Sequence, residues 1–199
     1  MAFNRRALLK LGLAAGVVAG GVGGLRADEV APVFASEIQQ VPYRFRRRDV
    51  AYQTAEPAGT IVVDTPNRFL YFVIGDGMAT RYGVGVGIRQ KLWSGEAIIK
   101  RKAEWPVWHP SPERLAQFPK LIKYEPDGMP GGADNPLGAR AMYLYQGDVD
   151  TLYRIHGTNR PTGIGRRVTS GCISMLNVDV VHLYDRVDIG TRVVVLPAA

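Results

Sequence analysis

Cysteine and long hydrophobic runs are the scarcest features of this sequence. The chain has 199 residues and a single cysteine, so an intramolecular disulfide and motifs with paired cysteines are excluded. The uncharged stretch at residues 11–25 spans 15 residues and contains six glycines, whereas a membrane-spanning helix needs about 20 apolar residues. These absences exclude a disulfide-stapled fold and a multi-span membrane protein.

The net positive charge is small over most of the chain, although the whole sequence carries a net charge of +7. Residues 1–27 hold four basic and no acidic residues, residues 28–48 contribute +1, and residues 49–199 contribute only +2. A domain this close to neutrality lacks the basic surface that nucleic-acid binding requires. With 46% hydrophobic and 22% charged residues, the composition is typical of one globular domain with appendages and excludes a disordered chain.

The first 27 residues have the pattern of an export signal. Arg5 and Arg6 precede the weakly hydrophobic, glycine-containing stretch, which is typical of a twin-arginine signal peptide. Leu25-Arg26-Ala27 is an imperfect cleavage site, because a large leucine stands where a small residue is preferred. A retained N-terminal anchor is the alternative interpretation. The pattern predicts export to the periplasm or cell envelope.

Residues 28–58 are interpreted as a polar lead-in, or linker, without regular periodicity. The basic cluster at residues 44–48 is expected to be a solvated arm, and contact with an anionic wall polymer or a membrane surface is the alternative. Residues 59–199 are expected to form one folded domain.

Short runs of β-branched and aromatic residues in this domain predict strands. The expected strands are residues 61–63, 68–74, 78–86, 97–105, 141–146, 151–155 and 191–196. Gly75-Asp76-Gly77 and Gly147-Asp148 are hairpin turn signals. Two short helices are expected, one from 112 to 118 with Ser111 as its N-cap and one from 177 to 187 capped by Asn177. The fold class is therefore mostly β, and a sandwich or open barrel is favoured over βαβ units.

Residues 124–138 are too rich in glycine and proline for regular structure. Loops of this length in compact domains are often functional. We therefore consider this loop a candidate wall or lid of a substrate site, a hypothesis that rests on its composition and length.

The candidate chemistry lies between residues 154 and 184. A predicted strand ends at His156, and Cys172 follows Gly171 after a glycine-bearing loop. Cysteine needs a base or a positive field to become a thiolate, and the loop is long enough to bring the sulfur back to the imidazole. Gly171 leaves room for a carbonyl group, and the backbone N–H groups of Gly171 and Cys172 are candidate oxyanion donors.

Two alternatives to catalysis stay open on the residues alone. One is a buried, inert cysteine, which is common in proteins. The other is a metal site with His156, Cys172 and His182 as ligands, although the sequence has no short-range ligand pair such as CxxC or HExxH. Catalysis is favoured over both, and no metal is expected.

The same region resembles a known family. The motif residues are His156-Gly157-Thr158-Asn159, Ile164-Gly165, Thr169-Ser170-Gly171-Cys172-Ile173, Met175, Asp179 and Leu183-Tyr184. In order and spacing they are similar to the L,D-transpeptidase catalytic domain family of the YkuD, or ErfK/YbiS, type, and the resemblance extends over residues 59–196. It implies a β-sandwich-like fold with one or two short helices, in which the site lies in a cleft beneath a mobile loop.

The resemblance also implies residue roles. Cys172 would be the nucleophile and His156 the proton donor and acceptor, with Gly171, Gly157 and Thr169 as oxyanion or supporting residues. The substrate-binding candidates are Ser170, Ser174, Arg160 and Asn159. The family generally has an arginine where this chain has Ser174. Arg160, Arg166 and Arg167 are candidates to supply the missing cation.

The implied activity is L,D-transpeptidation in peptidoglycan biosynthesis, through a cysteine thioester and with release of terminal D-alanine from tetrapeptide stems. No cofactor is expected, because thiolate, imidazole and oxyanion donors cover the steps. The acyl acceptor stays open between a second stem peptide, a lysine of an envelope protein, a free D-amino acid and water. A non-catalytic wall-binding module is an alternative of another class. The partners expected are peptidoglycan stem peptides, and the chain is expected to be a monomer.

Overall fold

The computed structural model describes residues 35–88 and 91–197. Its strands are β1 (Arg48–Ala51), β2 (Ile61–Asp64), β3 (Phe69–Gly75), β4 (Met78–Gly83), β5 (Val86–Gly87), β6 (Gly95–Glu104), β7 (Arg140–Gln146), β8 (Val149–His156), β9 (Arg167–Thr169), β10 (Ile173–Ser174) and β11 (Arg192–Val195). Its helices are η1 (Ala35–Gln40), η2 (Tyr43–Phe45), α2 (Pro112–Gln117), η4 (Pro119–Tyr124), η5 (Pro161–Gly163) and α3 (Asn177–Tyr184). The expected export signal at residues 1–27 lies outside the described residues.

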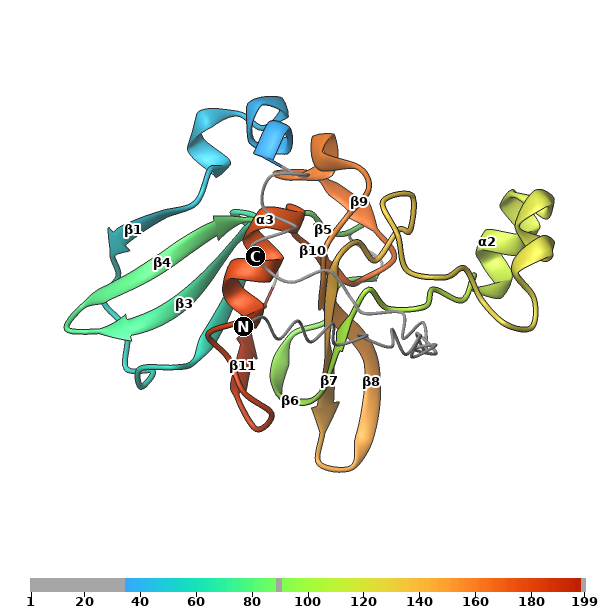
Figure 1. Cartoon of the computed structure of the whole chain (residues 1–199). Coiled ribbons are helices and arrows are strands. Elements are labelled where there is room, and N and C mark those ends of the chain that lie inside the picture. Colours follow the sequence, from blue (N-terminus) through green and yellow to red (C-terminus); the bar gives the residue numbers. More distant parts are fainter. Residues whose placement is uncertain (1–34, 89–90, 198–199) are drawn as a thin grey trace, which may run out of the picture.

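The strands form one large sheet and one small one (Figure 1). The large sheet has the order β1-β4-β3-β2-β11-β6-β7-β8-β10, and β5 pairs with β9 in the small one. Most neighbouring strands of the large sheet are antiparallel, but β2 and β11 are parallel, as are β8 and β10, and the pair β5–β9 of the small sheet is also parallel. The chain is mostly β, as predicted. The parallel pair β8–β10 brings the strand that ends at His156 next to the strand that follows Cys172, at one edge of the sheet.

The sheet folds around one main hydrophobic core. Ile61 and Val63 of β2, Ile99 of β6 and Leu144 of β7 are all fully buried, and Leu183 of α3 belongs to the same cluster. Side chains alternate along a strand, so the same face of β2 supplies both residues. Burial of one such side chain stabilises the fold by roughly 1.5–3 kcal/mol. The core therefore holds α3 against the sheet, directly after β10 in the chain.

Two local signals are confirmed in detail. Gly75, Asp76 and Gly77 all have positive φ angles at the β3–β4 turn, a conformation that glycine favours. Ser111 is the N-cap of α2, where its hydroxyl oxygen accepts a hydrogen bond from the Arg114 N–H at 3.3 Å.

The expected strand at residues 78–86 is interrupted in the structure. β4 ends at Gly83, and β5 belongs to the small sheet. A side chain at Gly83 would collide with the backbone and side chain of Phe45. Glycine at this position therefore lets η2 pack across the end of β4.

The prediction that Asn177 caps a helix is wrong. Leu176 is the N-cap of α3, and Asn177 is the first helical residue. The Asn177 side chain instead bonds Glu37, Ala139 and Thr158. The helix also ends at Tyr184 rather than at residue 187. A rule for helix N-caps considers only neighbouring residues, whereas Glu37, Ala139 and Thr158 are all distant from Asn177 in sequence.

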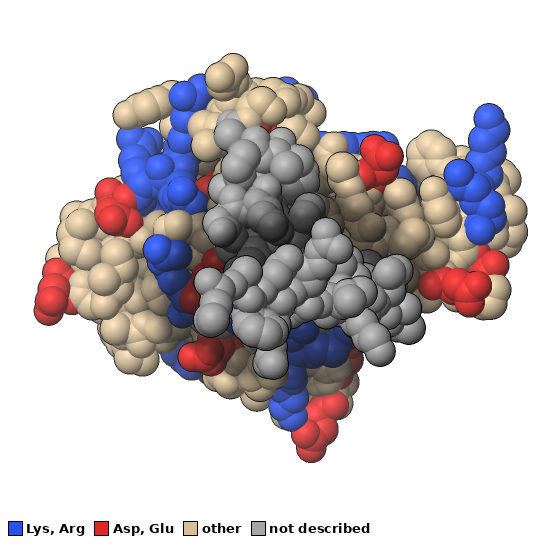
Figure 2. Space-filling model, in the orientation of Figure 1, with Lys and Arg blue, Asp and Glu red and all other residues tan. Residues whose placement is uncertain are grey.

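Part of the predicted lead-in is folded onto the domain. Val41 and Phe45 are buried, and they cluster with Phe69, Ile164 and Leu176. Arg47 forms an ion pair with the buried Asp179 at 3.3 Å, so at least one residue of the basic cluster is anchored to α3. Figure 2 shows basic side chains gathered at the end of the molecule where Figure 1 labels β1.

The glycine- and proline-rich loop that follows η4 extends from one side of the sheet (Figure 1). The buried Asn135 amide donates hydrogen bonds to the carbonyl oxygens of Pro106, Met129 and Pro130, at 3.0 to 3.1 Å. The Asn135 side chain thus connects the segment that precedes α2 with the loop that follows η4. Within the described ranges, the structure contains no helix with the length and apolar character needed to cross a membrane.

Candidate active site

His156 is the last residue of β8, beside the short strand β10. Ile155 pairs with Ile173, and His156 pairs with Ser174, in parallel register. Because side chains alternate between the faces of a strand, Ile155 and Ile173 enter the core while His156 and Ser174 lie on the other face. Cys172 directly precedes Ile173, so the same alternation puts its side chain on the face of His156. Both side chains line one cleft.

The His156 ring is held in one tautomer. Its Nδ1 atom lies 2.5 Å from the carbonyl oxygen of Gly157, and Nδ1 must donate because a carbonyl only accepts. Nε2 therefore keeps its lone pair and is the basic nitrogen. Burial lowers the pKa of His156 to about 4, an effect that the Gly157 hydrogen bond opposes and the Arg154 cation increases. His156 is neutral at pH 7 and ready to accept a proton.

We expect the His156 ring to titrate near pH 4, and not near the ordinary histidine value of 6.5. Burial disfavours the imidazolium, so the neutral, basic form persists as the pH falls to about 4. Following the ring Cε1–H resonance by NMR from about pH 3.5 to 8 measures this pKa. The resonance is assigned by its absence from the His156→Gln variant. A midpoint between about 6 and 7 would contradict the expectation.

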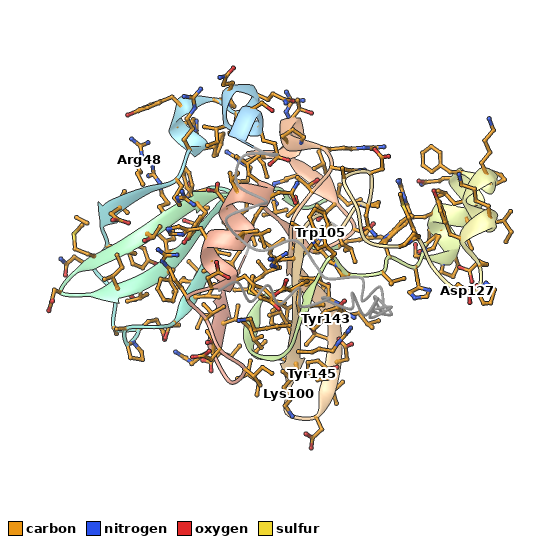
Figure 3. The ribbon with its side chains drawn as sticks, viewed as in Figure 1. Arg48, Lys100, Trp105, Asp127, Tyr143 and Tyr145 are labelled. Atoms are coloured by element: carbon orange, nitrogen blue, oxygen red, sulfur yellow. The ribbon has the colours of Figure 1, made fainter. Side chains whose placement is uncertain are left out.

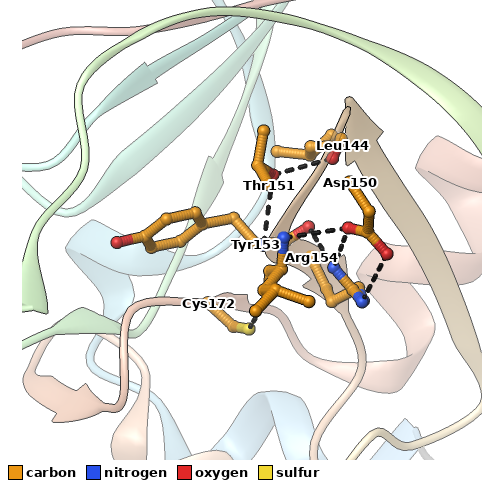
Figure 4. A network of polar contacts seen from close by, with 7 residues as sticks. Leu144, Asp150, Thr151, Tyr153, Arg154 and Cys172 are labelled. Carbon is orange, nitrogen blue, oxygen red and sulfur yellow. Dashed lines mark hydrogen bonds and ion pairs between the residues drawn. The ribbon is translucent and has the colours of Figure 1, made fainter. Parts of the chain in front are cut away.

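The Cys172 thiol lies against an irregular part of β8 (Figure 4). Its Sγ atom is 3.9 Å from the carbonyl oxygen of Leu152. Leu152 has a φ of 62°, which is rare for leucine, and its N–H donates to Asp150 Oδ1 at 2.8 Å. The Thr151 hydroxyl braces the same turn by donating to the Leu144 carbonyl oxygen at 2.7 Å. These bonds orient the Leu152 carbonyl group toward Cys172 Sγ.

Burial raises the pKa of the Cys172 thiol, while the Arg154 backbone N–H and the Arg154 cation oppose the rise. Together with the lowered pKa of His156, this favours a neutral thiol and a neutral imidazole at pH 7. A preformed thiolate–imidazolium pair is not favoured.

Thr169 holds the loop that carries Cys172. Its hydroxyl donates to the Cys172 carbonyl oxygen at 2.5 Å and accepts from the Gly171 N–H at 3.2 Å. Gly171 has a φ of 128°, and a side chain there would collide with the Tyr153 ring, so the position requires glycine. Of the two candidate oxyanion donors, the Gly171 N–H already donates to the Thr169 hydroxyl oxygen.

Asn177 supports the loop behind His156. Its Oδ1 atom accepts from the Ala139 N–H at 2.9 Å, and its Nδ2 atom donates to the Thr158 carbonyl oxygen at 2.7 Å. The Glu37 carboxylate accepts from the Asn177 N–H and Nδ2 at 2.9 and 2.8 Å. A side chain at Gly157 would collide with Asn177. The residue whose carbonyl orients His156 is therefore packed directly against this network.

The sequence analysis missed the pairing of Glu37 with Asn177. The two residues are 140 positions apart, and neither belongs to a pattern that marks a polar contact. Their importance is visible only from burial. Both residues are buried, and the hydrogen bonds between them satisfy polar groups that water does not reach.

Cys172 and His156 open into a cleft of about 730 Å³. The other predicted site residues that line it are Asn159, Arg160, Thr169, Ser170 and Ser174. Asn159 donates to the Asp134 carbonyl oxygen at 2.6 Å, and Ser174 donates to the Gly85 carbonyl oxygen at 3.4 Å. These two side chains are therefore engaged within the protein, whereas Arg160 and Ser170 are exposed.

The cleft wall includes some of the residues considered as substitutes for the family arginine. Arg160 and Arg166 line the cleft, and among its described lining residues Arg167 is absent. Pro136 and Leu137, from the loop predicted to be a substrate wall, also line it.

A row of side chains that the sequence analysis missed crosses the sheet toward Cys172. Arg101 of β6 pairs with Tyr143 of β7, which pairs with Arg154 of β8. The guanidinium carbons of Arg101 and Arg154 lie 3.3 and 4.6 Å from the centre of the Tyr143 ring, labelled in Figure 3. Arg154 stands two residues before His156, so strand alternation could have placed it on this face. The other two depend on strand register.

His182, the third ligand of the alternative metal site, lies elsewhere. Its Nδ1 atom is 2.8 Å from the Tyr82 hydroxyl, and it lines a second groove together with Arg47 and Arg186. Across residues 35–88 and 91–197, no group of three or more His, Cys, Asp and Glu side chains is arranged to hold a metal ion.

Comparison with known proteins gives a family match. The model of the family described as "L,D-transpeptidase catalytic domain" (YkuD) matches residues 58–195. The protein described as "Probable L,D-transpeptidase ErfK/SrfK" of Escherichia coli K12 is 36% identical over 139 residues, which are 68% of this chain. That alignment covers 43% of the relative, so the chain matches less than half of that protein's length.

Two solved structures are also similar. One, described as "a Probable carnitine operon oxidoreductase caia" from Brucella melitensis, is 48% identical, with a TM-score of 0.53 over 81% of this chain and 99% of that one. The other is L,D-transpeptidase 3 from Mycobacterium tuberculosis, at 16% identity and a TM-score of 0.51 over 69% of this chain and 60% of that one. At that identity the second likeness concerns the fold alone.

Proposed function

The chain belongs to the L,D-transpeptidase catalytic domain family, and from this premise we propose that it is a cysteine acyltransferase that cross-links peptidoglycan stem peptides. The observation that carries the proposal is the placement of Cys172 and His156 on one face and in one cleft. The tautomer of His156 supports it, because the nitrogen that is not bonded to Gly157 is the one able to take a proton.

In the proposed first step, Cys172 Sγ attacks the carbonyl carbon of the diamino acid that precedes terminal D-alanine, and His156 Nε2 takes the thiol proton. The resulting oxyanion is stabilised by backbone N–H groups, for which those of Gly171 and Cys172 are the candidates. When the carbon–nitrogen bond breaks, His156 gives its proton to the departing D-alanine amine. A thioester is left on Cys172.

In the second step an acceptor amine attacks the thioester carbonyl. His156 Nε2 takes a proton from this amine, and the sulfur leaves and recovers that proton as a thiol. The product is a new amide bond, and the enzyme returns to its neutral pair. No other chemical group is required by this sequence of proton transfers.

The proposal is tested by incubating the purified chain with tetrapeptide muropeptides and identifying the products by mass. We expect cross-linked dimers and free D-alanine. Tripeptides would identify water as the acceptor and an L,D-carboxypeptidase, and an exchanged terminal residue would identify a free D-amino acid as the acceptor. Attachment to a lysine of an envelope protein is tested by adding a lysine-containing peptide of such a protein as the acceptor amine. Unchanged tetrapeptide would contradict the proposal and favour a non-catalytic wall-binding module.

The site of action proposed is the periplasm or cell envelope, where stem peptides are located. The support for export is the pattern of Arg5 and Arg6 followed by the weakly hydrophobic stretch 11–25. Fractionation of cells that express the full chain tests this part, with the protein expected outside the cytoplasmic membrane.

A further inference from the structure

The walls of the active cleft carry charge of one sign. Its lining includes the arginines Arg101, Arg114, Arg154, Arg160 and Arg166, and none of its described lining residues is Asp or Glu. Arg154 is neutralised by Asp150, which it binds through two hydrogen bonds of 2.8 and 3.0 Å. The other four arginines form no ion pair with an acidic residue of the described ranges.

These four arginines come from different walls. Arg101 lies on β6 and Arg114 on α2, while Arg160 and Arg166 lie between β8 and β9. Three arginines outside the cleft are paired with acids: Arg47 with Asp179, Arg140 with Glu104, and Arg192 with Glu96. Like charges held around one cavity repel one another, and a cavity lined by one sign of charge concentrates ligands of the opposite sign.

The row Arg101–Tyr143–Arg154 extends the positive charge of the cleft across the sheet, away from the loop that carries Cys172. Neighbouring strands are about 4.8 Å apart, so Arg101 on β6 lies roughly 14 Å across the sheet from the loop that carries Cys172. An extended peptide covers this distance with about four residues. Arg101 is stacked on the Tyr143 ring, which fixes its guanidinium group without consuming its hydrogen-bond donors.

We propose that this cleft selects stem peptides with free side carboxylates and discriminates against stems in which those carboxylates are amidated. The inference rests on the proposed function and names the form of the substrate. Guanidinium groups bind carboxylates through paired, charge-assisted hydrogen bonds, whereas a primary amide carries no charge and offers one acceptor. Arg101 and Arg166 bind the substrate away from the scissile bond.

The test compares two synthetic tetrapeptides that differ only in their side carboxylates, which are free in one and amidated in the other. The terminal D-alanine carboxylate is free in both. We expect the full chain to use the free-acid peptide with a kcat/KM about tenfold higher or more, the effect of one charge-assisted hydrogen bond. This preference should shrink as salt is raised, because salt screens exposed charges.

Arg101→Gln and Arg166→Gln should lower kcat/KM for the free-acid peptide and leave it nearly unchanged for the amidated one. Arg48→Gln is the matched control, because Arg48 is also exposed but lies on β1, at the opposite edge of the sheet (Figure 3). It should alter neither value. Equal use of the two peptides by the unmodified chain, or an equal loss on both in the cleft variants, would overturn this inference alone. No turnover of either peptide would overturn the proposed function with it.

Discussion

Replacement of Cys172 by alanine should abolish thioester formation while the fold is retained. In the proposed mechanism, loss of the nucleophile removes the step that every later step requires, and comparable removals in other enzymes cost at least about 10³-fold in rate. Cys172 is a half-buried residue, and the contact of its Sγ atom with the Leu152 carbonyl oxygen is a long one of 3.9 Å. We therefore expect the free energy of unfolding to change by less than about 1 kcal/mol.

The measurement combines two readouts on the same preparation. Mass spectrometry of the intact protein after exposure to an acylating β-lactam reports the covalent adduct, and urea denaturation reports stability. His156→Gln is the companion variant: it keeps the thiol but removes the base, so acylation should be slow instead of absent. Turnover of tetrapeptide by Cys172→Ala would refute the assignment of the nucleophile.

Replacement of Asn177 by alanine should destabilise the domain by about 3–5 kcal/mol. The change leaves the Ala139 N–H and the Thr158 carbonyl without their partner, and it leaves the buried Glu37 carboxylate without the Nδ2 donor. Burial already raises the pKa of Glu37, and the Asn177 bonds oppose that rise. Without Nδ2, the pKa of Glu37 should therefore rise further.

Urea denaturation of Asn177→Ala beside Asn67→Ala measures this loss against a matched control. Asn67 is an exposed turn residue whose amide bonds Asp64 at 2.8 Å, so its replacement should cost no more than about 0.5 kcal/mol. A loss for Asn177→Ala that is as small as the control would show that the network contributes little. Because Asn177 packs against Gly157, acylation of Cys172 in the surviving folded fraction should also slow.

Local signals predicted the secondary structure where the interaction partners are local. The glycines at the β3–β4 turn and the serine cap of α2 act within a few residues, so the pattern contains all the relevant groups. The prediction failed at Gly83, where the strand stops because Phe45 occupies the space of a side chain. It also failed at Asn177, because the partners of its side chain lie on three other segments.

The functional motif could be read without coordinates because its chemistry requires particular residue types in a particular order. A strand ending in histidine and a glycine before cysteine identify the candidate pair, and the longer motif from His156 to Tyr184 identifies the family. The protonation states of His156 and Cys172 could not be predicted from the sequence, because they depend on burial. The pKa of His156 falls to about 4 because the folded chain removes water from the ring. Likewise, the sequence total of +2 for residues 49–199 concealed a cleft lined by arginines without acids.

Residue order and type were enough to specify the mostly β fold, the nucleophile and base candidates, and the family to which the chain belongs. The orientation of the imidazole, the Glu37–Asn177 support and the charge of the cleft arise only when the chain folds. The physical reason is that each depends on strand register and on burial between residues far apart in sequence. A shift of one residue in the β8–β10 register would turn His156 and Ser174 to opposite faces.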